Sequence, residues 1–244
     1  MLPQVNIIRA KNADFLCFYE SAGISGVLAA HGVWDELTIH FAKTLIDETP
    51  LKPVVIDVGA NMGTFAVPIA RHIEKLAGVV HAFEPQRIIY YQLCGNIFFN
   101  RIDNIFAHNF ALSNADTISN VSPLDFNKSW NIGSYSLSES TVNVQPLSNG
   151  TEKILFKKLD DYSDDTPITL IKIDVEGMEL EVLQGGVKLI IQSNFPPVLF
   201  ESNEGDPKGP LVFQLLSEMG YNISKYAASD YLAQHPNFPA EMLK

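Results

Sequence analysis

Two apolar runs in this chain of 244 residues lead directly into acidic side chains, a pattern that can support ligand binding or proton transfer. The run 54–56 is followed by Asp57, and the run 79–83 by Glu84. Nearly continuous apolar runs of this length are typical of buried parallel strands. Parallel strands present their carboxyl ends at one edge of a sheet, where open α/β sheets bind ligands. Both acids are therefore expected at a site, although capping of a following helix is the structural alternative.

A turn rich in glycine follows Asp57. Gly59, Asn61 and Gly63 stand at alternate positions before an apolar stretch with helical character. Glycine lets the backbone approach a ligand, and a helix N-terminus favours negative charge, so the turn suits a nucleotide cofactor. A dinucleotide needs a bare glycine where Asn61 stands, because the diphosphate passes there. The turn therefore favours a donor without phosphate, S-adenosylmethionine, with Asp57 and the three turn residues binding it. A nicotinamide-dependent oxidoreductase is the disfavoured alternative.

Glu84 is placed to bind the ribose of such a cofactor. It lies roughly twenty residues beyond the glycine turn, where an acid at the end of the second strand can accept two ribose hydroxyls. A carboxylate has two acceptor oxygens, which match the two donors of a vicinal diol. The order and the spacing of the two motifs together predict one cofactor site.

A third group of charged residues comes from the run 168–174. Period-two alternation puts Lys172 and Asp174 on the same face of this strand, with Asp174 at its carboxyl end. Asp174 could act as a base, hold the ammonium of the donor or ligate a metal ion. Lys172 is expected to neutralise a neighbouring acid, Asp174 or Asp57, more than to take part in catalysis. Glu176 is placed either to contact substrate or to cap the next helix.

The fifth strand, 197–201, adds acceptor-side and metal candidates. It ends in Glu201, and Asn203 follows two residues later. Glu201 is a candidate for contact with the substrate. If a metal ion is present, Asp174, Glu201 and Asn203 are its expected ligands, because oxygen donors suit Mg²⁺. A metal-free site is favoured.

Strands and helices must alternate to bring these residues together. Their order predicts an α/β fold, a doubly wound and mostly parallel sheet with a close strand pair at the C-terminal end. The expected strands are 54–58, 79–83, 105–110, 168–174, 197–201, 221–226 and 230–233. The expected helices are 64–76, 86–100, one from about 177, and 207–219. We assign 51–244 to this domain.

Two segments lie outside the alternation. Residues 1–50 are expected to form an N-terminal helical extension, in which 34–46 is a helix with Leu37, Phe41, Thr44 and Leu45 on one side. Residues 113–158 form a polar insertion, with short strands expected at 141–144 and 154–158 around an Asn-Gly turn.

The insertion carries candidates for binding a sugar. Trp130 and Asn131 combine an aromatic face with an amide, which suits the apolar C–H faces and hydroxyl rims of carbohydrates. A solvent-exposed hairpin or a dimer contact is the structural alternative for this segment.

Composition narrows the class of partner. A net charge of −11 argues against a nucleic-acid substrate, because phosphates repel an acidic surface. The two cysteines have no metal-binding or redox spacing. No window has the length of a membrane span, and the N-terminus lacks the pattern of a signal peptide. We therefore expect a cytoplasmic enzyme without stable membrane insertion that acts on a small molecule or a carbohydrate. The sequence leaves its oligomeric state open.

The chain resembles the FkbM-type methyltransferases in several stretches, which are 55–63, 82–85, 159–162, 171–183 and 197–201. The most specific is the motif Ile-Lys-x-Asp-x-Glu-Gly in 171–177. The resemblance covers about 32–233. It implies a class I methyltransferase fold, which is Rossmann-like, with an antiparallel final strand pair. It also implies S-adenosylmethionine as donor and transfer to a hydroxyl of a sugar, a glycolipid, a polysaccharide or a related natural product.

The resemblance also places the adenine ring beside 109–113, which makes Ala111 a cofactor-binding candidate with mostly backbone contacts. From the residues alone, a non-catalytic cofactor-binding protein of the same fold stays open as an alternative. The carboxylates on the fourth and fifth strands weigh against it.

Overall fold

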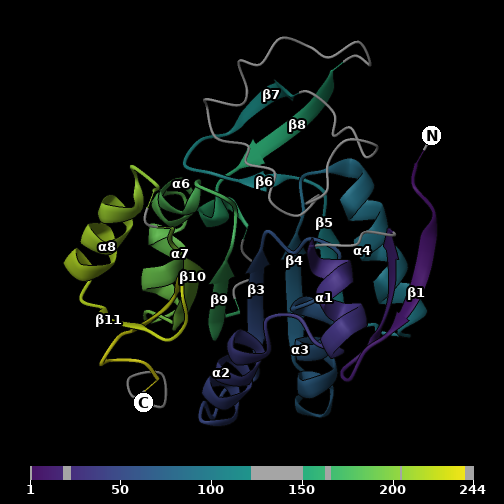
Figure 1. Cartoon of the computed structure of the whole chain (residues 1–244). Helices are drawn as coiled ribbons and strands as arrows, with labels where there is room; N and C mark the ends of the chain where they lie inside the picture. The colour runs from purple at the N-terminus through teal and green to yellow at the C-terminus, as the bar shows by residue number, and fades with distance from the viewer. Residues whose placement is uncertain (1, 19–22, 122–150, 163–165, 204, 240–244) are drawn as a thin grey trace.

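The computed structural model of the chain describes residues 2–18, 23–121, 151–162, 166–203 and 205–239 (Figure 1). Its centre is a seven-stranded sheet in the order β11-β12-β10-β9-β3-β4-β5. The strands are β3 (Val54–Val58), β4 (Val79–Phe83), β5 (Ile105–His108), β9 (Leu170–Ile173), β10 (Val198–Glu201), β11 (Asn222–Lys225) and β12 (Asp230–Gln234). All neighbours from β10 to β5 are parallel, whereas β12 is antiparallel to both β10 and β11. The predicted fold class is confirmed.

Helices cover both faces of the sheet (Figure 1). On one face, a hydrophobic cluster joins Val55 and Leu170 to α1 (Gly23–His31), α2 (Glu36–Asp47), α3 (Ala66–Ile73) and α4 (Arg87–Phe99). On the other face, Ile56 and Ile171 pack with α6 (Glu179–Gln184), α7 (Val187–Gln192) and α8 (Gly209–Glu218). Strand residues alternate between the two clusters because successive side chains of a strand point to opposite faces.

The N-terminal extension differs from the helical segment expected. It begins with an antiparallel hairpin of β1 (Val5–Arg9) and β2 (Asp14–Phe18). Amide side chains of α4 hold β2, since the backbone N–H of Leu16 donates to Asn96 at 2.7 Å. Such pairing between distant segments leaves no local signal. The hairpin turn also lacks Gly and Pro, the usual sequence markers of a turn.

The expected helix at 34–46 is present as α2, and its predicted packed side is right in part. Leu45 is buried and Phe41 packs against the core, whereas Leu37 is 52% exposed and Thr44 is also exposed. The other buried residues of the helix include Ile39, Ala42 and Ile46. Helical periodicity gave the right element, but apolar residues stand on two faces and only packing against the sheet decides between them.

Strands of the insertion pair with the segment just before it to form a second, three-stranded sheet in the order β6-β8-β7. Its strands are β6 (Ala111–Leu112), β7 (Thr117–Val121) and β8 (Glu152–Lys157). The expected strand at 154–158 is therefore present as β8, paired with β7 and β6. Its expected partner at 141–144, and the sugar-binding candidates Trp130 and Asn131, lie outside the described residues.

Candidate active site

Gly59 holds the turn after β3 against the segment that follows β9. Its φ is +80°, and a Cβ atom there would lie only 1.8 Å from the backbone oxygen of Asp174. The N–H groups of Gly59 and Ala60 both donate to the backbone oxygen of Phe83, at 3.0 and 2.9 Å. Only glycine fits this position, and the contact fixes the carboxyl ends of β3, β4 and β9 relative to one another.

Asn61 and Gly63 differ in their places in the turn. Asn61 has a φ of +50° and lines two neighbouring pockets. Its side-chain oxygen accepts the N–H of Met62 at 2.7 Å, a local bond that favours this left-handed conformation. Gly63 has a φ of +93°, and a Cβ atom there would lie 2.9 Å from Leu93. Gly63 therefore brings α3 close to α4 and is absent from the lining of both pockets.

Glu84 is buried in the wall of the first pocket. Its Oε2 accepts the backbone N–H of Asn61 at 3.0 Å, and its Oε1 accepts that of Gln86 at 2.8 Å. Burial raises the pKa of this carboxyl group to about 7, although both backbone bonds oppose the shift. Each carboxylate oxygen retains acceptor capacity for a second hydrogen bond. The side chain is thus held rigidly in a position from which it can bind a pair of hydroxyls.

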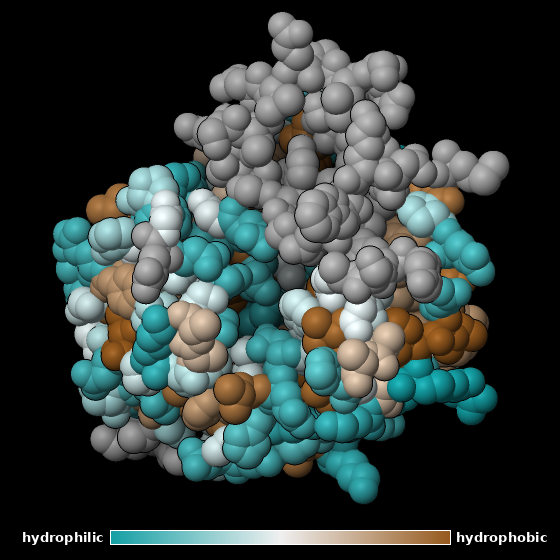
Figure 2. Space-filling view, viewed as in Figure 1, coloured by the Kyte–Doolittle hydropathy of each residue, from teal (hydrophilic) through white to brown (hydrophobic). Residues whose placement is uncertain are grey.

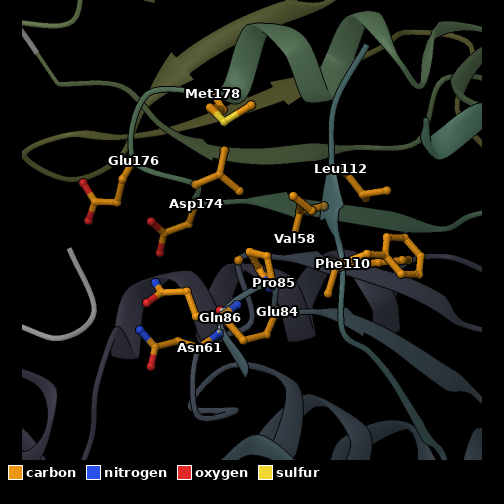
Figure 3. A pocket seen from close by; sticks show the side chains of 14 residues that line it. Val58, Asn61, Glu84, Pro85, Gln86, Phe110, Leu112, Asp174, Glu176 and Met178 are labelled. Atoms are coloured by element: carbon orange, nitrogen blue, oxygen red, sulfur yellow. Dashed lines mark hydrogen bonds between the residues drawn. The ribbon is translucent and has the colours of Figure 1, made fainter. Parts of the chain in front are cut away.

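The first pocket, named here the Glu84 pocket, encloses about 570 Å³ including its mouth. This lies within the roughly 300–1,000 Å³ of small-molecule sites. Figure 3 shows its lining, which includes Val58, Phe110, Leu112 and Met178 as apolar members. Ala111 also lines it, as the sequence predicts. Its apolar walls suit a purine ring, and its polar end is formed by Glu84 and the glycine turn.

A second pocket, named here the Trp34 pocket, encloses about 690 Å³ on the α1–α2 side of the same sheet edge. It is lined by Ile24, Trp34, Asp35, Gly59, Ala60, Asn61, Thr64, Phe65, Lys172, Asp174, Glu176 and Glu201. The two pockets share Gly59, Asn61, Asp174 and Glu176. Sequence reasoning missed Trp34 and Asp35 as site residues, because they lie between α1 and α2, far along the chain from the strand-end motifs.

Lys172 neutralises two acids, as the sequence predicts. Its Nζ lies 3.1 Å from Asp174 Oδ2 and 3.6 Å from Asp57 Oδ1. β3 and β9 are in register at Asp57 and Lys172, which sets this proximity. Burial alone would lower the pKa of Lys172, but Asp174, Asp57 and Asp35 together raise it above its usual value. The lysine therefore remains charged.

Asp57 lies beneath the site and is absent from the lining of both pockets. It is fully buried, and burial raises its pKa to about 6 against the opposing charge of Lys172. The structure therefore does not bring this predicted cofactor residue to the pocket surface. Asp57 instead forms an ion pair with Lys172, and the same ammonium forms a second ion pair with Asp174.

Asp174, Glu176 and Glu201 bring carboxylate oxygens within 4.8 Å of one another. The sequence predicts Asn203 rather than Glu176 beside the other two. In the structure Asn203 donates to Glu201 Oε1 at 3.2 Å, so it supports Glu201 instead of joining the cluster. Burial, followed by the charges of Asp174, Glu201 and Glu179, raises the pKa of Glu176 to about 7. Three oxygen donors at this spacing could hold a hard divalent cation or a cationic group of a ligand.

An acidic residue at the start of the helix after β9 is buried. Glu179 accepts the N–H groups of Val175 and Gly177, at 3.2 and 3.1 Å, although an acid in a first helical turn commonly faces solvent. These bonds fix the loop that carries Asp174 and Glu176. Glu176 itself has a φ of +55°, so its side chain is not a simple helix cap. Figure 3 shows Asp174 and Glu176 projecting to the same open side of the pocket as the amides of Asn61 and Gln86.

The molecular surface around this site is polar, like the junction of the two pockets. Figure 2 shows mostly hydrophilic residues around the hollow in the middle of this face. Among the described residues, no helix has the length and the apolar character needed to cross a membrane.

Comparison with known proteins decides the family. Residues 57–223, more than half of the chain, match the methyltransferase FkbM domain. The chain belongs to the FkbM methyltransferase family. This membership confirms the resemblance noted in the sequence and makes the protein an S-adenosylmethionine-dependent methyltransferase. The oxidoreductase alternative is not supported.

Individual relatives agree with this family. The methyltransferase is 27% identical over 207 residues to Methyltransferase sdnD of Sordaria araneosa, covering 74% of this chain and 78% of that one. A crystal structure of methyltransferase FkbM from Methylobacillus flagellatus is similar in fold, with a TM-score of 0.50 and 20% identity over 75% of this chain. The methyltransferase spans 44% of the length of that protein. A protein of Corynebacterium glutamicum matches with a TM-score of 0.53 at 10% identity, covering 88% and 89% of the two chains.

Proposed function

We propose that this methyltransferase transfers the methyl group of S-adenosylmethionine to a hydroxyl of a sugar, a glycolipid, a polysaccharide or a related natural product. The observation that carries the proposal is the junction of two pockets at Gly59, Asn61, Asp174 and Glu176. One pocket has the shape and polarity for an adenosine, and the other opens beside it with acceptors for hydroxyl groups. Methyl transfer is an in-line displacement, which requires the two substrates to meet end to end.

The residues fit the donor. Gly59 lets the turn after β3 lie directly against the backbone of Asp174 at the junction of the pockets, Glu84 offers oxygens for the ribose, and Ala111 lies where backbone contacts to the adenine are expected. When bound, S-adenosylmethionine supplies an activated methyl group on a positively charged sulfur. The acids at the junction favour this positive charge and the ammonium of the donor.

The protein must orient the acceptor and remove its proton, because the donor is already activated. Asp174 stands at the junction of the pockets with Oδ2 bonded to Lys172, which leaves Oδ1 for the acceptor hydroxyl. We assign Asp174 to proton removal, Glu176 and Glu201 to contacts with the acceptor, and Lys172 to positioning Asp174.

Titration calorimetry tests the donor assignment. We expect S-adenosylmethionine to bind in the micromolar range and NAD not to bind. Glu84→Ala should weaken binding by about 1–3 kcal/mol, because the ribose hydroxyls lose their partner. Glu218→Ala, in an exposed Gln–Glu pair on α8, is the matched control and should bind as the wild type does. Binding of NAD without S-adenosylmethionine would contradict the proposal.

Turnover distinguishes the remaining possibilities. Transfer of a labelled methyl group to sugar hydroxyls supports the O-methyltransferase assignment, whereas tight donor binding with no transfer to any hydroxyl supports a non-catalytic protein. Thorough chelation with EDTA separates the metal-free mechanism from one that uses a divalent cation on the three carboxylates. Unchanged turnover would leave Asp174 without a metal role.

A further inference from the structure

The lining of the Trp34 pocket combines two chemically different kinds of side chain. Ile24, Trp34 and Phe65 are its large apolar members, and two of them are aromatic. The acidic members are Asp35, Asp174, Glu176 and Glu201. Aromatic surface together with several hydrogen-bond acceptors suits a ligand with C–H faces and hydroxyl donors.

Within the described part of the chain, no cation in this pocket is available to an anionic ligand. Lys172 is the only basic side chain among the described residues that line it, and its ammonium is already shared between Asp174 and Asp57. The same ammonium lies 5.6 Å from the centre of the Phe65 ring. Asp230 lies near the same group of charges, and burial, followed by the charges of Asp35 and Asp174, raises its pKa to about 6. A phosphate or carboxylate next to these acids would meet repulsion without compensation.

Asp35 is held in a fixed orientation within the pocket. Its backbone has a φ of +53°, and the hydroxyl of Thr38 donates to its carboxylate. The same hydroxyl lies 3.0 Å from the phenol oxygen of Tyr226, which directly follows β11. The acceptor of a hydrogen bond is thus fixed beside Trp34 before any ligand arrives, which is a feature of selective sites.

We propose that the Trp34 pocket selects an acceptor that carries no negative charge near the reacting hydroxyl, with Trp34 as the stacking surface and Asp35 as the selectivity residue. This deepens the proposed function and rests on it. It follows that the enzyme acts on a glycoside rather than on a sugar phosphate. A glycosyl transfer or a dephosphorylation must therefore come before the methylation.

Saturation-transfer NMR on the protein loaded with S-adenosylhomocysteine tests, without turnover, whether the pocket selects against negatively charged acceptors. The probes are the methyl glycosides of glucose and galactose, the corresponding 6-phosphates and the corresponding uronates. We expect the neutral glycosides to bind and both anionic series to bind at least about tenfold more weakly, or not at all. Asp35→Asn should narrow this gap. Equal or tighter binding of the anionic probes, or no binding of any neutral glycoside to the loaded protein, overturns the inference.

Variants of Trp34 test the stacking surface. Trp34→Ala should weaken binding of the neutral glycosides roughly tenfold, and Trp34→Phe should restore most of it, because a smaller aromatic face remains. Leu37→Ala is the control, since Leu37 lies nearby on α2, is exposed and is absent from the pocket lining. Affinity for S-adenosylhomocysteine should stay unchanged in all three variants. Wild-type glycoside binding by Trp34→Ala overturns the stacking role. Failure of the wild-type protein to bind any S-adenosyl cofactor refutes the proposed function itself.

Discussion

The Glu84 pocket and the Trp34 pocket share four residues but are assembled differently. Every segment that lines the Glu84 pocket directly follows a strand of the central sheet, namely 58–61, 83–86, 110–112 and 174–178. The Trp34 pocket adds Ile24 from α1 and the Trp34–Asp35 connection from the N-terminal extension. One pocket is a property of the sheet edge, and the other requires an additional segment to fold over that edge.

Their electrostatics differ in the same way. In the Glu84 pocket, backbone N–H groups engage the buried carboxylate of Glu84. In the described lining of the Trp34 pocket, four carboxylates stand beside one lysine, although Thr38 donates to Asp35, and Asn203 and Ser229 donate to Glu201. In the proposed donor pocket the buried carboxylate is bonded to the backbone, whereas the proposed acceptor pocket keeps an excess of acids.

Gly59→Ala should damage both pockets together, because Gly59 lines both. The new Cβ atom would overlap the backbone oxygen of Asp174 at a left-handed φ. Strain and overpacking together cost roughly 2–6 kcal/mol. We expect this loss in chemical denaturation, with loss of donor binding.

Gly205→Ala is the matched control, since a Cβ atom there meets nothing within 4 Å. It should leave unfolding and donor binding near wild type. A Gly59→Ala protein that is stable and binds the donor normally would show that the junction described here does not form.

Lys172→Met should affect the Trp34 pocket more than the Glu84 pocket. It leaves the fully buried Asp57 without its counter-charge, which costs about 3–5 kcal/mol when a buried pair is broken. Urea denaturation at pH 8 should show the loss. At pH 5 the loss should be smaller, because the raised pKa of Asp57 lets it take up a proton.

Two further variants are controls for the loss of the buried Lys172–Asp57 ion pair. Adding Asp57→Asn to Lys172→Met should recover part of the stability, since it removes the uncompensated acid. Lys208→Met breaks a more exposed pair with Glu181 and should cost less than about 1 kcal/mol. Equal losses in Lys172→Met and Lys208→Met would mean that the buried cluster contributes no more than a surface pair.

The contrast between the pockets also explains what the sequence could predict. Gly59, Asn61 and Glu84 lie in motifs next to strands, and they line the Glu84 pocket together with Ala111, the candidate that the family resemblance supplies. Trp34 and Asp35 depend on where α2 packs, and helical periodicity alone identified the packed face of that helix only in part. The β1–β2 hairpin was missed for a related reason, since α4 holds it through side-chain amides.

Two misplaced roles have a similar physical origin. Asp57 belongs to the right motif, but its side chain points toward Lys172 beneath the pocket, which depends on the register of β3 against β9. Glu179 has the sequence character of a surface residue, but it is buried by the loop whose N–H groups it accepts. Both acids lie in motifs that the sequence shows, but the direction of each side chain is set by packing.

Asp174→Asn tests the point where the two pockets meet. The fold should stay intact, because the amide keeps the shape and an acceptor for Lys172. Turnover should fall by at least about 100-fold, the usual scale for loss of a general base. Donor affinity, measured by calorimetry, should change much less. A variant with wild-type turnover would remove Asp174 from the mechanism. It would also show that this shared residue does not couple the two pockets in catalysis.

The smallest expected effect is a pH dependence of stability that comes from the Glu84 pocket. Burial is the largest cause that raises the pKa of three glutamates, Glu84, Glu176 and Glu179, to about 7. The folded protein therefore holds protons that the unfolded chain releases near pH 4.5, so this stability is present at low pH and lost as the pH rises through 7. His108 acts in the opposite direction, because burial, followed by the charges of His81 and Lys157, lowers its pKa to about 4. Its contribution changes only below pH 6.5.

The interval from pH 6.5 to 8 therefore covers the titration of these three glutamates. In the protein without ligand, the free energy of unfolding should fall by on the order of 1 kcal/mol across this interval. Glu84→Gln removes one of the three titrating glutamates and should make the slope shallower. Saturation with S-adenosylmethionine should also reduce the slope or reverse it, because a positively charged ligand favours ionised carboxylates. Urea unfolding at four pH values, with and without the donor, measures this directly. A stability that rises with pH in the wild type, or a slope that Glu84→Gln leaves unchanged, would show that Glu84 is already ionised at pH 6.5.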